Sequence, residues 1–246
     1  MTKLYEKNET AFAVMWILIY IFGTCLAEAL SEMAGIYKLF PAIFHAGLAA
    51  FILVWVKRNG LTEKYGLFLP RYRLSQAWFF LPLVLVASYK VVFSPALRYA
   101  PVESMLFVVS MLCVGFLEEM IFRGFLFRAI EKKNLTRAVA ISAVTFGIGH
   151  IVNLINGQDL LETCGQIIFA VVIGFTLVIL FHRGGSLVPC IVFHSVFNAF
   201  SVISNEEAQM QALGGPVAAT AILVGASAVL LGVYTLWNRK HLKGWT

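Results

Sequence analysis

Residues 114–128 read V-G-F-L-E-E-M-I-F-R-G-F-L-F-R, so two adjacent carboxylates and an arginine lie inside a long apolar segment. An ionised side chain at the centre of a bilayer costs at least about 2.5 to 3.5 kcal/mol on insertion scales. Glu119 and Arg123 stand four residues apart on one helix face and can pair, whereas Glu118 points about 100° away without a partner in its own helix. The pattern therefore predicts that Glu118 is the carboxylate left free for chemistry.

The composition indicates an integral membrane protein. The chain has 246 residues, of which 60% are hydrophobic and 13% are charged, and this is too apolar for a water-soluble fold. The net charge of +6 comes from basic residues in short loops between apolar runs. We therefore expect membrane lipids as partners and no nucleic acid. The four cysteines lack a C-x-x-C spacing and are typical of buried free thiols.

Apolar runs near the roughly 20-residue length of a membrane helix recur along the chain. They predict an all-α polytopic membrane protein, with about eight transmembrane helices around an intramembrane cavity, built as a single domain over residues 1–246. The expected spans are 11–34, 39–56, 75–93, 102–130, 138–155, 164–182, 186–204 and 215–237. Loops rich in Lys and Arg alternate with loops that carry acidic residues, and this asymmetry predicts that both termini lie in the cytoplasm.

Further polar residues lie inside the apolar spans at similar depth. Glu118 and His150 are each 13 residues from the cytoplasmic boundary of their spans, or roughly 20 Å deep. His194 and Asn198 stand at i and i+4 on the seventh span, roughly 12 and 18 Å deep. We expect these four side chains to converge on one cavity. The alternative is that each of them separately holds helices together, as polar residues do in many membrane bundles.

These residue types suit the hydrolysis of a peptide bond inside the membrane. A carboxylate in a poorly solvated cavity is a strengthened base, and a neighbouring histidine can help to orient and deprotonate a water. His194 and Asn198 can donate hydrogen bonds to the oxyanion that forms when this water attacks a carbonyl. No G-x-S-x-G motif or suitably spaced cysteine indicates a covalent nucleophile. Two histidines and a carboxylate could instead hold zinc, although H-E-x-x-H is absent, so a metal is the second mechanism.

Three motifs on separate apolar spans carry a resemblance to a known family. They are Glu118-Glu119-x-x-x-Arg123, Phe146-x-x-x-His150 and His194-x-x-x-Asn198. Together they resemble the CPBP family, which includes the type II CAAX prenyl endopeptidases and bacterial bacteriocin-processing or immunity relatives. The resemblance covers roughly residues 102–204, the expected catalytic core.

The resemblance implies an eight-helix intramembrane endopeptidase with a glutamic mechanism that requires no cofactor. The roles that it implies are activation of water by Glu118 and His150, an oxyanion hole of His194 and Asn198, and a supporting role for Glu119, Arg123 and Phe146. The implied substrates are membrane-embedded, lipidated or leader-type peptides, including bacteriocins. The short chain without soluble insertions is more similar to bacterial members, which implies the plasma membrane as its location.

Two other classes of function stay open at the level of the sequence. One is a non-catalytic membrane scaffold or bacteriocin-immunity factor that binds a partner through the same cavity. The other is a carrier, since intramembrane carboxylates and histidines also relay protons. The oligomeric state is open as well.

Overall fold

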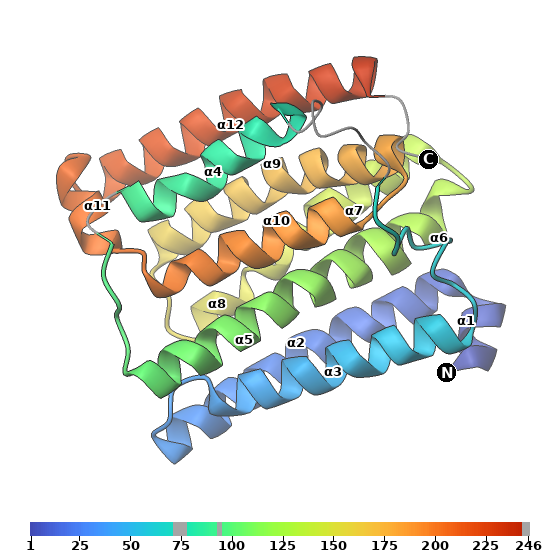
Figure 1. The fold of residues 1–246 in the computed structure, drawn as a ribbon, viewed down its shortest axis with the longest axis horizontal. Coiled ribbons are helices and arrows are strands. Elements are labelled where there is room, and N and C mark those ends of the chain that lie inside the picture. Colours follow the sequence, from blue (N-terminus) through green and yellow to red (C-terminus); the bar gives the residue numbers. More distant parts are fainter. Residues whose placement is uncertain (71–77, 93–94, 243–246) are drawn as a thin grey trace.

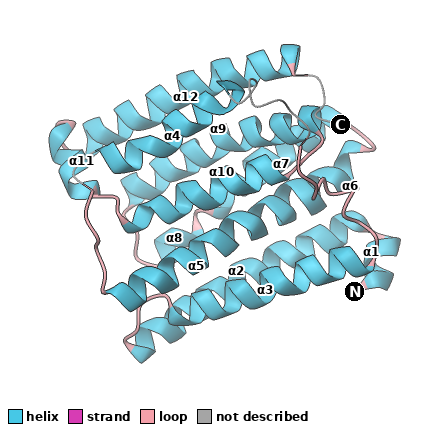
Figure 2. Cartoon of the chain, viewed as in Figure 1, coloured by secondary structure: helices cyan, strands magenta, loops and turns pink. Residues whose placement is uncertain are grey.

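The computed structural model describes residues 1–70, 78–92 and 95–242, and the regular elements in these ranges are all helices (Figure 1, Figure 2). The long helices lie side by side along the long axis of the molecule (Figure 1). In chain order the elements are α1 (Thr2–Lys7), α2 (Glu9–Ala34), α3 (Leu39–Arg58), α4 (Leu81–Val92), α5 (Pro101–Glu118), the π-helix η2 (Glu119–Phe127), α6 (Arg128–Glu131), α7 (Leu135–Gly149), α8 (Val152–Ile155), α9 (Leu160–Gly184), α10 (Val188–Ala199), the 3₁₀ helix η3 (Phe200–Val202), α11 (Glu206–Ala212) and α12 (Pro216–His241).

The predicted all-α membrane fold is confirmed. Among the described residues, six helices are long and apolar enough to cross a membrane. A seventh crossing results if the bent pair Val188–Val202 and Glu206–Ala212, which meet at 88°, forms one span. The predicted third span, 75–93, extends into residues outside the described ranges, and its described part, Trp78–Val92, is an apolar helix shorter than the roughly 20 residues of a full span. With this helix the number of membrane helices agrees with the prediction of about eight.

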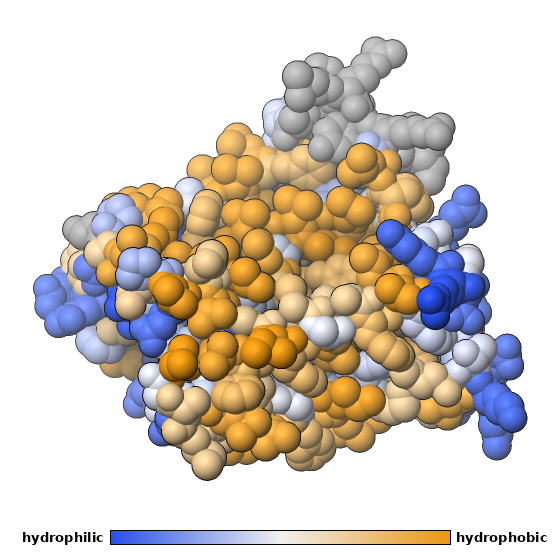
Figure 3. Space-filling view, turned by 60° about the horizontal axis from the view of Figure 1, so that its bottom comes forward, coloured by the Kyte–Doolittle hydropathy of each residue, from blue (hydrophilic) through white to orange (hydrophobic). Residues whose placement is uncertain are grey.

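The surface of the molecule is that of a protein embedded in lipid. Hydrophobic side chains cover the middle of the face in view, while hydrophilic side chains gather towards its two ends (Figure 3). Large apolar residues such as Phe22 on α2 and Val229 on α12 are 69% and 70% exposed. An apolar surface of this extent is typical of contact with a membrane.

The two ends of the bundle differ in what they carry. α1 and the last turn of α12 lie at one end of the bundle (Figure 1), which we call the terminal end. There Glu9 binds Lys64 and Lys132, whose ammonium nitrogens lie 2.6 and 3.0 Å from its carboxylate oxygens. The opposite end, which we call the distal end, contains the turn 35–38 and the loop 156–158. The first and last helices of the described chain therefore reach the same side of the bundle.

A cluster of aromatic rings fills the terminal half of the core. Phe12 and Trp16 on α2 pack against Trp55 on α3 and Phe125 on η2, with ring centroids 4.9 to 6.4 Å apart. All four side chains are buried. This aromatic cluster lies between the terminal end and the polar residues near the middle of α2, because Phe12 precedes Tyr20 by eight residues, or about 12 Å of helix.

The stretch with the paired carboxylates is not a regular α-helix. From Glu119 to Phe127 the chain forms a π-helix, and all nine of its residues are buried. Hydrogen bonds in a π-helix run from residue i to i+5, and long π-helical segments are rare and frequently lie at functional sites. The sequence predicted an uninterrupted α-helix here, and the π-helix is the main local difference from that expectation.

Gly115 sets the distance between α5 and α10. A Cβ atom at this position would lie 2.4 Å from the backbone nitrogen of Ser195. The hydroxyl of Ser195 in turn donates to the carbonyl of Leu112 at 2.8 Å. This close approach brings the end of α5, which carries Glu118, beside the turn of α10 that carries His194.

We expect Gly115→Ala to lower the free energy of unfolding by about 1–3 kcal/mol, because the added methyl group must push α10 away from α5. The matched control is Gly225→Ala in α12, where a Cβ would meet nothing within 4 Å. The control should not destabilise the protein, since Ala is favoured over Gly in a helix. Midpoints of thermal unfolding in detergent compare the two variants, and equal midpoints would show that the helices do not approach this closely.

Candidate active site

Two carboxylates and one imidazole form the centre of the site. Glu118 ends α5, Glu119 begins η2, and His194 extends from α10 to lie between them. Nδ1 of His194 is 2.8 Å from Oε1 of Glu119, and Nε2 is 3.2 Å from Oε2 of Glu118. All three side chains are buried, and a buried carboxylate retains its charge only with partners of this kind.

Arg123 supplies the second positive group. Its side chain is fully buried, and Nη1 lies 3.2 Å from Oε1 of Glu119, so the predicted pairing within this helix is confirmed. The guanidinium carbon also lies 4.2 Å from the centroid of the Phe146 ring. Within the described residues the guanidinium nitrogens make no directed hydrogen bond. Arg123 is therefore held by charge attraction and by the face of the aromatic ring rather than by a two-pronged hydrogen-bonded pair.

The charges in this cluster can balance one another. An imidazolium at His194 donates to both carboxylates, whereas a neutral ring has a single N–H. With His194 charged, two positive groups face Glu118 and Glu119 and the sum of the four is zero. Such a balance lowers the cost of keeping ionised side chains in the interior of a membrane. We call Glu118, Glu119, Arg123 and His194 the charge cluster.

A cavity of about 90 Å³ lies next to Glu118. We call it the Glu118 cavity; its polar lining comes from Tyr20 and Thr24 on α2, Glu118, His150 and the two asparagines around α8. The hydroxyl of Tyr20 donates to Oε1 of Glu118 at 2.8 Å. Glu118 therefore has two partners, Tyr20 and His194, both on other helices. The space is large enough for ordered water, which needs about 10–15 Å³ and several polar partners.

His150 lines the same cavity as Glu118 and caps the end of α7. Its Nδ1 lies 3.1 Å from the carbonyl oxygen of Phe146. A carbonyl only accepts hydrogen bonds, so Nδ1 carries a proton, and in the neutral ring Nε2 is then an acceptor. The Phe146 ring packs edge-on against both His150 and His194, at centroid distances of 5.2 and 5.6 Å. Phe146 thus positions both imidazoles.

Asn198 lies one helical turn beyond His194 on α10. Its side chain is half-buried, it does not line the Glu118 cavity, and no hydrogen bond joins its amide to another described residue. Of the four side chains expected to converge on one cavity, Glu118 and His150 line it, whereas His194 and Asn198 do not. His194 joins the group through its contacts with Glu118, Glu119 and Phe146, and Asn198 lies beside it. Its place in an oxyanion hole stays a prediction.

Over residues 1–70, 78–92 and 95–242, no group of three or more His, Cys, Asp and Glu side chains has an arrangement that could hold a metal ion. Both ring nitrogens of His194 already face carboxylate oxygens, so this ring would have to give up one contact to bind zinc. Zinc therefore stays the second mechanism.

A comparison with protein families finds a match over residues 101–200, to the model described as Type II CAAX prenyl endopeptidase Rce1-like. The match contains every residue of the three motifs. This segment is Rce1-like. The match confirms the resemblance to the CPBP family and supports a CAAX-type protease in an integral membrane protein. Comparisons with curated proteins and with solved structures found no match.

Tyr20 is the residue that sequence reasoning missed, and it lies outside the Rce1-like segment. It comes from α2, whose apolar sequence indicated only a membrane span. Tyrosine is enriched at membrane interfaces, yet Tyr20 is about 18 Å along the helix from its N-cap Asn8. A hydroxyl at that depth requires a hydrogen-bond partner. The position of Tyr20 deep within an apolar span was therefore the sequence signal from which its role could have been predicted.

His45 holds α2 in the position that Tyr20 requires. Its Nε2 contacts the hydroxyl of Thr24 on α2 at 3.0 Å, and its Nδ1 contacts the hydroxyl of Ser110 on α5 at 2.9 Å. The buried imidazole therefore joins α3 to α2, which carries Tyr20, and to α5, which carries Glu118.

We expect Glu119→Gln to lower the free energy of unfolding by about 3–5 kcal/mol, because it leaves the buried Arg123 guanidinium without its counter-charge. The matched control is Glu206→Gln, which breaks an ion pair with Arg98 whose side chains are 42% and 43% exposed. That change should cost at most about 1 kcal/mol. Thermal unfolding of the purified proteins measures both, and equal effects would argue against a charge cluster that stabilises the fold.

Proposed function

We propose that this protein is an intramembrane endopeptidase that hydrolyses a peptide bond of a membrane-embedded, lipidated or leader-type peptide, with water activated at Glu118. The observation that carries the proposal is the shared cavity of Glu118 and His150, with the Tyr20 hydroxyl on the carboxylate. The protease family matched by residues 101–200 supports it. A cleft-like cavity with converging polar groups is the default location of an active site.

In this proposal Glu118 acts as the general base. It takes a proton from a water between itself and His150, whose Nε2 accepts a hydrogen bond from the same water and orients it. The resulting hydroxide attacks the carbonyl carbon of the peptide and forms a tetrahedral oxyanion. Glu118 then passes the proton to the amide nitrogen, the carbon–nitrogen bond breaks, and the carboxyl and amine products leave.

The remaining residues position the base and stabilise the developing charge. Glu119 holds Nδ1 of His194, which fixes the ring so that Nε2 faces Glu118 and the reacting atoms. Donors near the oxyanion are worth about 2.7 to 4 kcal/mol each in other hydrolases. We assign this part to His194, whose Nε2–H shifts its hydrogen bond from Glu118 to the oxyanion once Glu118 has taken the proton of the water, with Asn198 as a second donor one turn further along α10. Arg123 and Phe146 keep Glu119 and His194 in place.

We expect Glu118→Gln to reduce cleavage by about 10²- to 10⁴-fold, the range of a lost general base. Folded protein should be retained, because a neutral His194 keeps the charges of Glu119 and Arg123 balanced in this variant. The measurement compares peptide termini in membranes and medium of cells that carry the wild type, Glu118→Gln or no protein, with matched expression. Termini that require the wild type would also identify the substrate. Identical profiles from wild type and Glu118→Gln would contradict the mechanism.

A graded variant tests the same mechanism through a neighbouring group. Tyr20→Phe removes one hydrogen bond to the Glu118 carboxylate and should slow formation of the same products by about 10- to 100-fold, since such a bond is worth about 1.5–3 kcal/mol. Tyr234→Phe is the matched control, because the Tyr234 hydroxyl is buried without a hydrogen-bond partner in the described chain. It should leave the rate unchanged.

Zinc at the glutamate and histidine side chains is the second mechanism. If it operates, purified active protein should contain about one equivalent of metal and lose activity to chelators. We expect the opposite result, full activity in metal-free protein. Loss of activity that returns with added Zn²⁺ would overturn the glutamic mechanism in favour of the metal.

The alternative function is a non-catalytic scaffold or bacteriocin-immunity factor. The mutual pairing of all four groups in the charge cluster favours it, because a fully paired cluster also stabilises helix packing. In that case Glu118→Gln leaves all peptide termini unchanged and alters only binding of a partner.

For the location we propose the plasma membrane with cytoplasmic termini, since loops rich in Lys and Arg favour the cytoplasmic side.

A further inference from the structure

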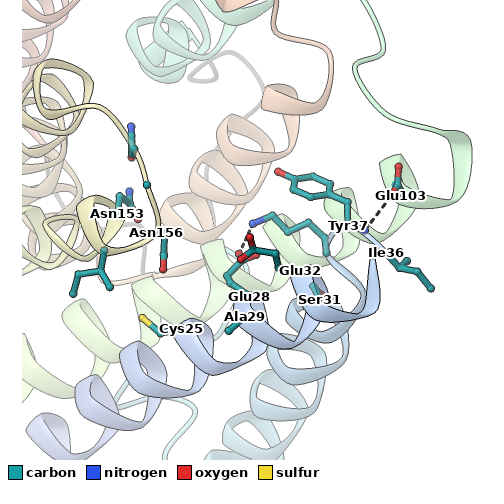
Figure 4. A pocket seen from close by; sticks show the side chains of 15 residues that line it. Cys25, Glu28, Ala29, Ser31, Glu32, Ile36, Tyr37, Glu103, Asn153 and Asn156 are labelled. Atoms are coloured by element: carbon teal, nitrogen blue, oxygen red, sulfur yellow. Dashed lines mark hydrogen bonds and ion pairs between the residues drawn. The ribbon is translucent and has the colours of Figure 1, made fainter.

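A second and larger cavity opens at the distal end of the bundle. Its volume is about 1040 Å³, and we call it the distal cavity. Its walls come from the last turns of α2, the turn after that helix, the start of α5 and the segment around α8 (Figure 4). The labelled side chains in Figure 4 are mostly polar, which is unusual for a space beside transmembrane helices.

The distal cavity adjoins the Glu118 cavity. Asn153 and Asn156 line both of them, so the two spaces share a wall at α8 (Val152–Ile155). The amide of Asn153 donates to Oε1 of Gln166 on α9 at 2.9 Å, which holds α8 at this junction. A molecule in the distal cavity therefore lies next to the space in front of Glu118.

A polar stripe on α2 follows the same path. Tyr20 and Thr24 line the Glu118 cavity, and Glu28 and Glu32 line the distal cavity. These residues recur every four positions, and each step of four turns by about 40°, so neighbours in the series lie close together while the stripe winds around the helix. From Glu32 to Tyr20 the stripe covers about 18 Å at 1.5 Å per residue and turns by about 120°. An apolar membrane helix thus carries one winding polar stripe from the distal end to the partner of Glu118.

The wall of the distal cavity is acidic. Glu28 forms an ion pair with Lys38, whereas Glu32 and Glu103 have no ion-pair partner in the described part of the chain. Glu103 accepts the backbone N–H of Tyr37 at 3.0 Å, which ties the turn to α5. Two carboxylates without counter-ions in one concave space attract positive charge.

We propose that the distal cavity is the vestibule through which the substrate reaches Glu118, and that it admits a polypeptide segment with positive charge. The segment passes Asn153 and Asn156, with its backbone amides available to their side chains, before it reaches the water at Glu118. The inference rests on the proposed function, because a route for cleavage requires a peptidase. With cytoplasmic termini, the vestibule opens on the outer side of the membrane and receives translocated peptides.

The native Cys25 tests the vestibule without a known substrate, because it lines the distal cavity. In a protein with Cys113, Cys164 and Cys190 replaced by Ala, membrane-impermeant methanethiosulfonates are applied to sealed vesicles of either orientation. Cys25 should react only from the side opposite the termini. The cationic trimethylammonium reagent should react at least about tenfold faster than the anionic sulfonate, after correction for their rates with a free thiol. Glu32→Gln with Glu103→Gln should remove most of this difference.

A second arm tests passage of the substrate. Ala29 lines the distal cavity, and Ala29→Trp should reduce the Glu118-dependent products at least about tenfold by filling the route. The control is Leu30→Trp at the next position, which is exposed and does not line the cavity, and its products should match the wild type.

The two arms separate this inference from the proposed function. If Glu118-dependent products form but Cys25 reacts only from the side of the termini, or Ala29→Trp cleaves like the wild type, the vestibule is wrong and the peptidase stands. If the wild type and Glu118→Gln yield the same products, the proposed function fails, and the substrate route fails with it.

Discussion

The contact of one imidazole with two neighbouring carboxylates constrains the rest of the molecule. His194 has to lie between Glu118 and Glu119 because ionised groups inside a membrane are costly unless they are paired. For α10 to come this close to α5, the helices must touch along their backbones, and Gly115 allows it. Arg123, one helical turn after Glu119, supplies the second positive charge that balances the two carboxylates. The packing of the central helices therefore follows from the requirement to neutralise this cluster.

The same contact has a consequence for chemistry. Glu118 lies where the α-helix gives way to the π-helix, so adjacent carboxylates can serve different purposes. Glu119 is fully enclosed with Arg123 and His194, while Glu118 reaches the cavity with Tyr20 and His150. A rigid, charge-balanced support behind a single accessible carboxylate is an arrangement that reduces reorganisation during a reaction.

The features that follow from position along one helix could be predicted from the sequence. The all-helical membrane fold, the pair of Glu119 and Arg123, and the common cavity of Glu118 and His150 follow from the rise and pitch of a helix. The π-helix, the contribution of Tyr20 and the two-sided contacts of His194 could not be predicted. They depend on how helices pack laterally, and a single sequence contains no direct record of lateral order. Asn198 is an intermediate case, since its helical face was predicted while its contacts were not.

The aromatic cluster of Phe12, Trp16, Trp55 and Phe125 also bears on how the membrane potential would be distributed across the molecule. If the proposed vestibule holds water, it would conduct from the distal end to Glu118, whereas the tightly packed rings towards the terminal end would insulate. The membrane potential, about 2.3 kcal/mol per charge at 100 mV, would then fall mainly across this aromatic layer. A charged peptide at Glu118 would cross little of that potential, and the membrane would stay sealed to ions while its interior is open to water.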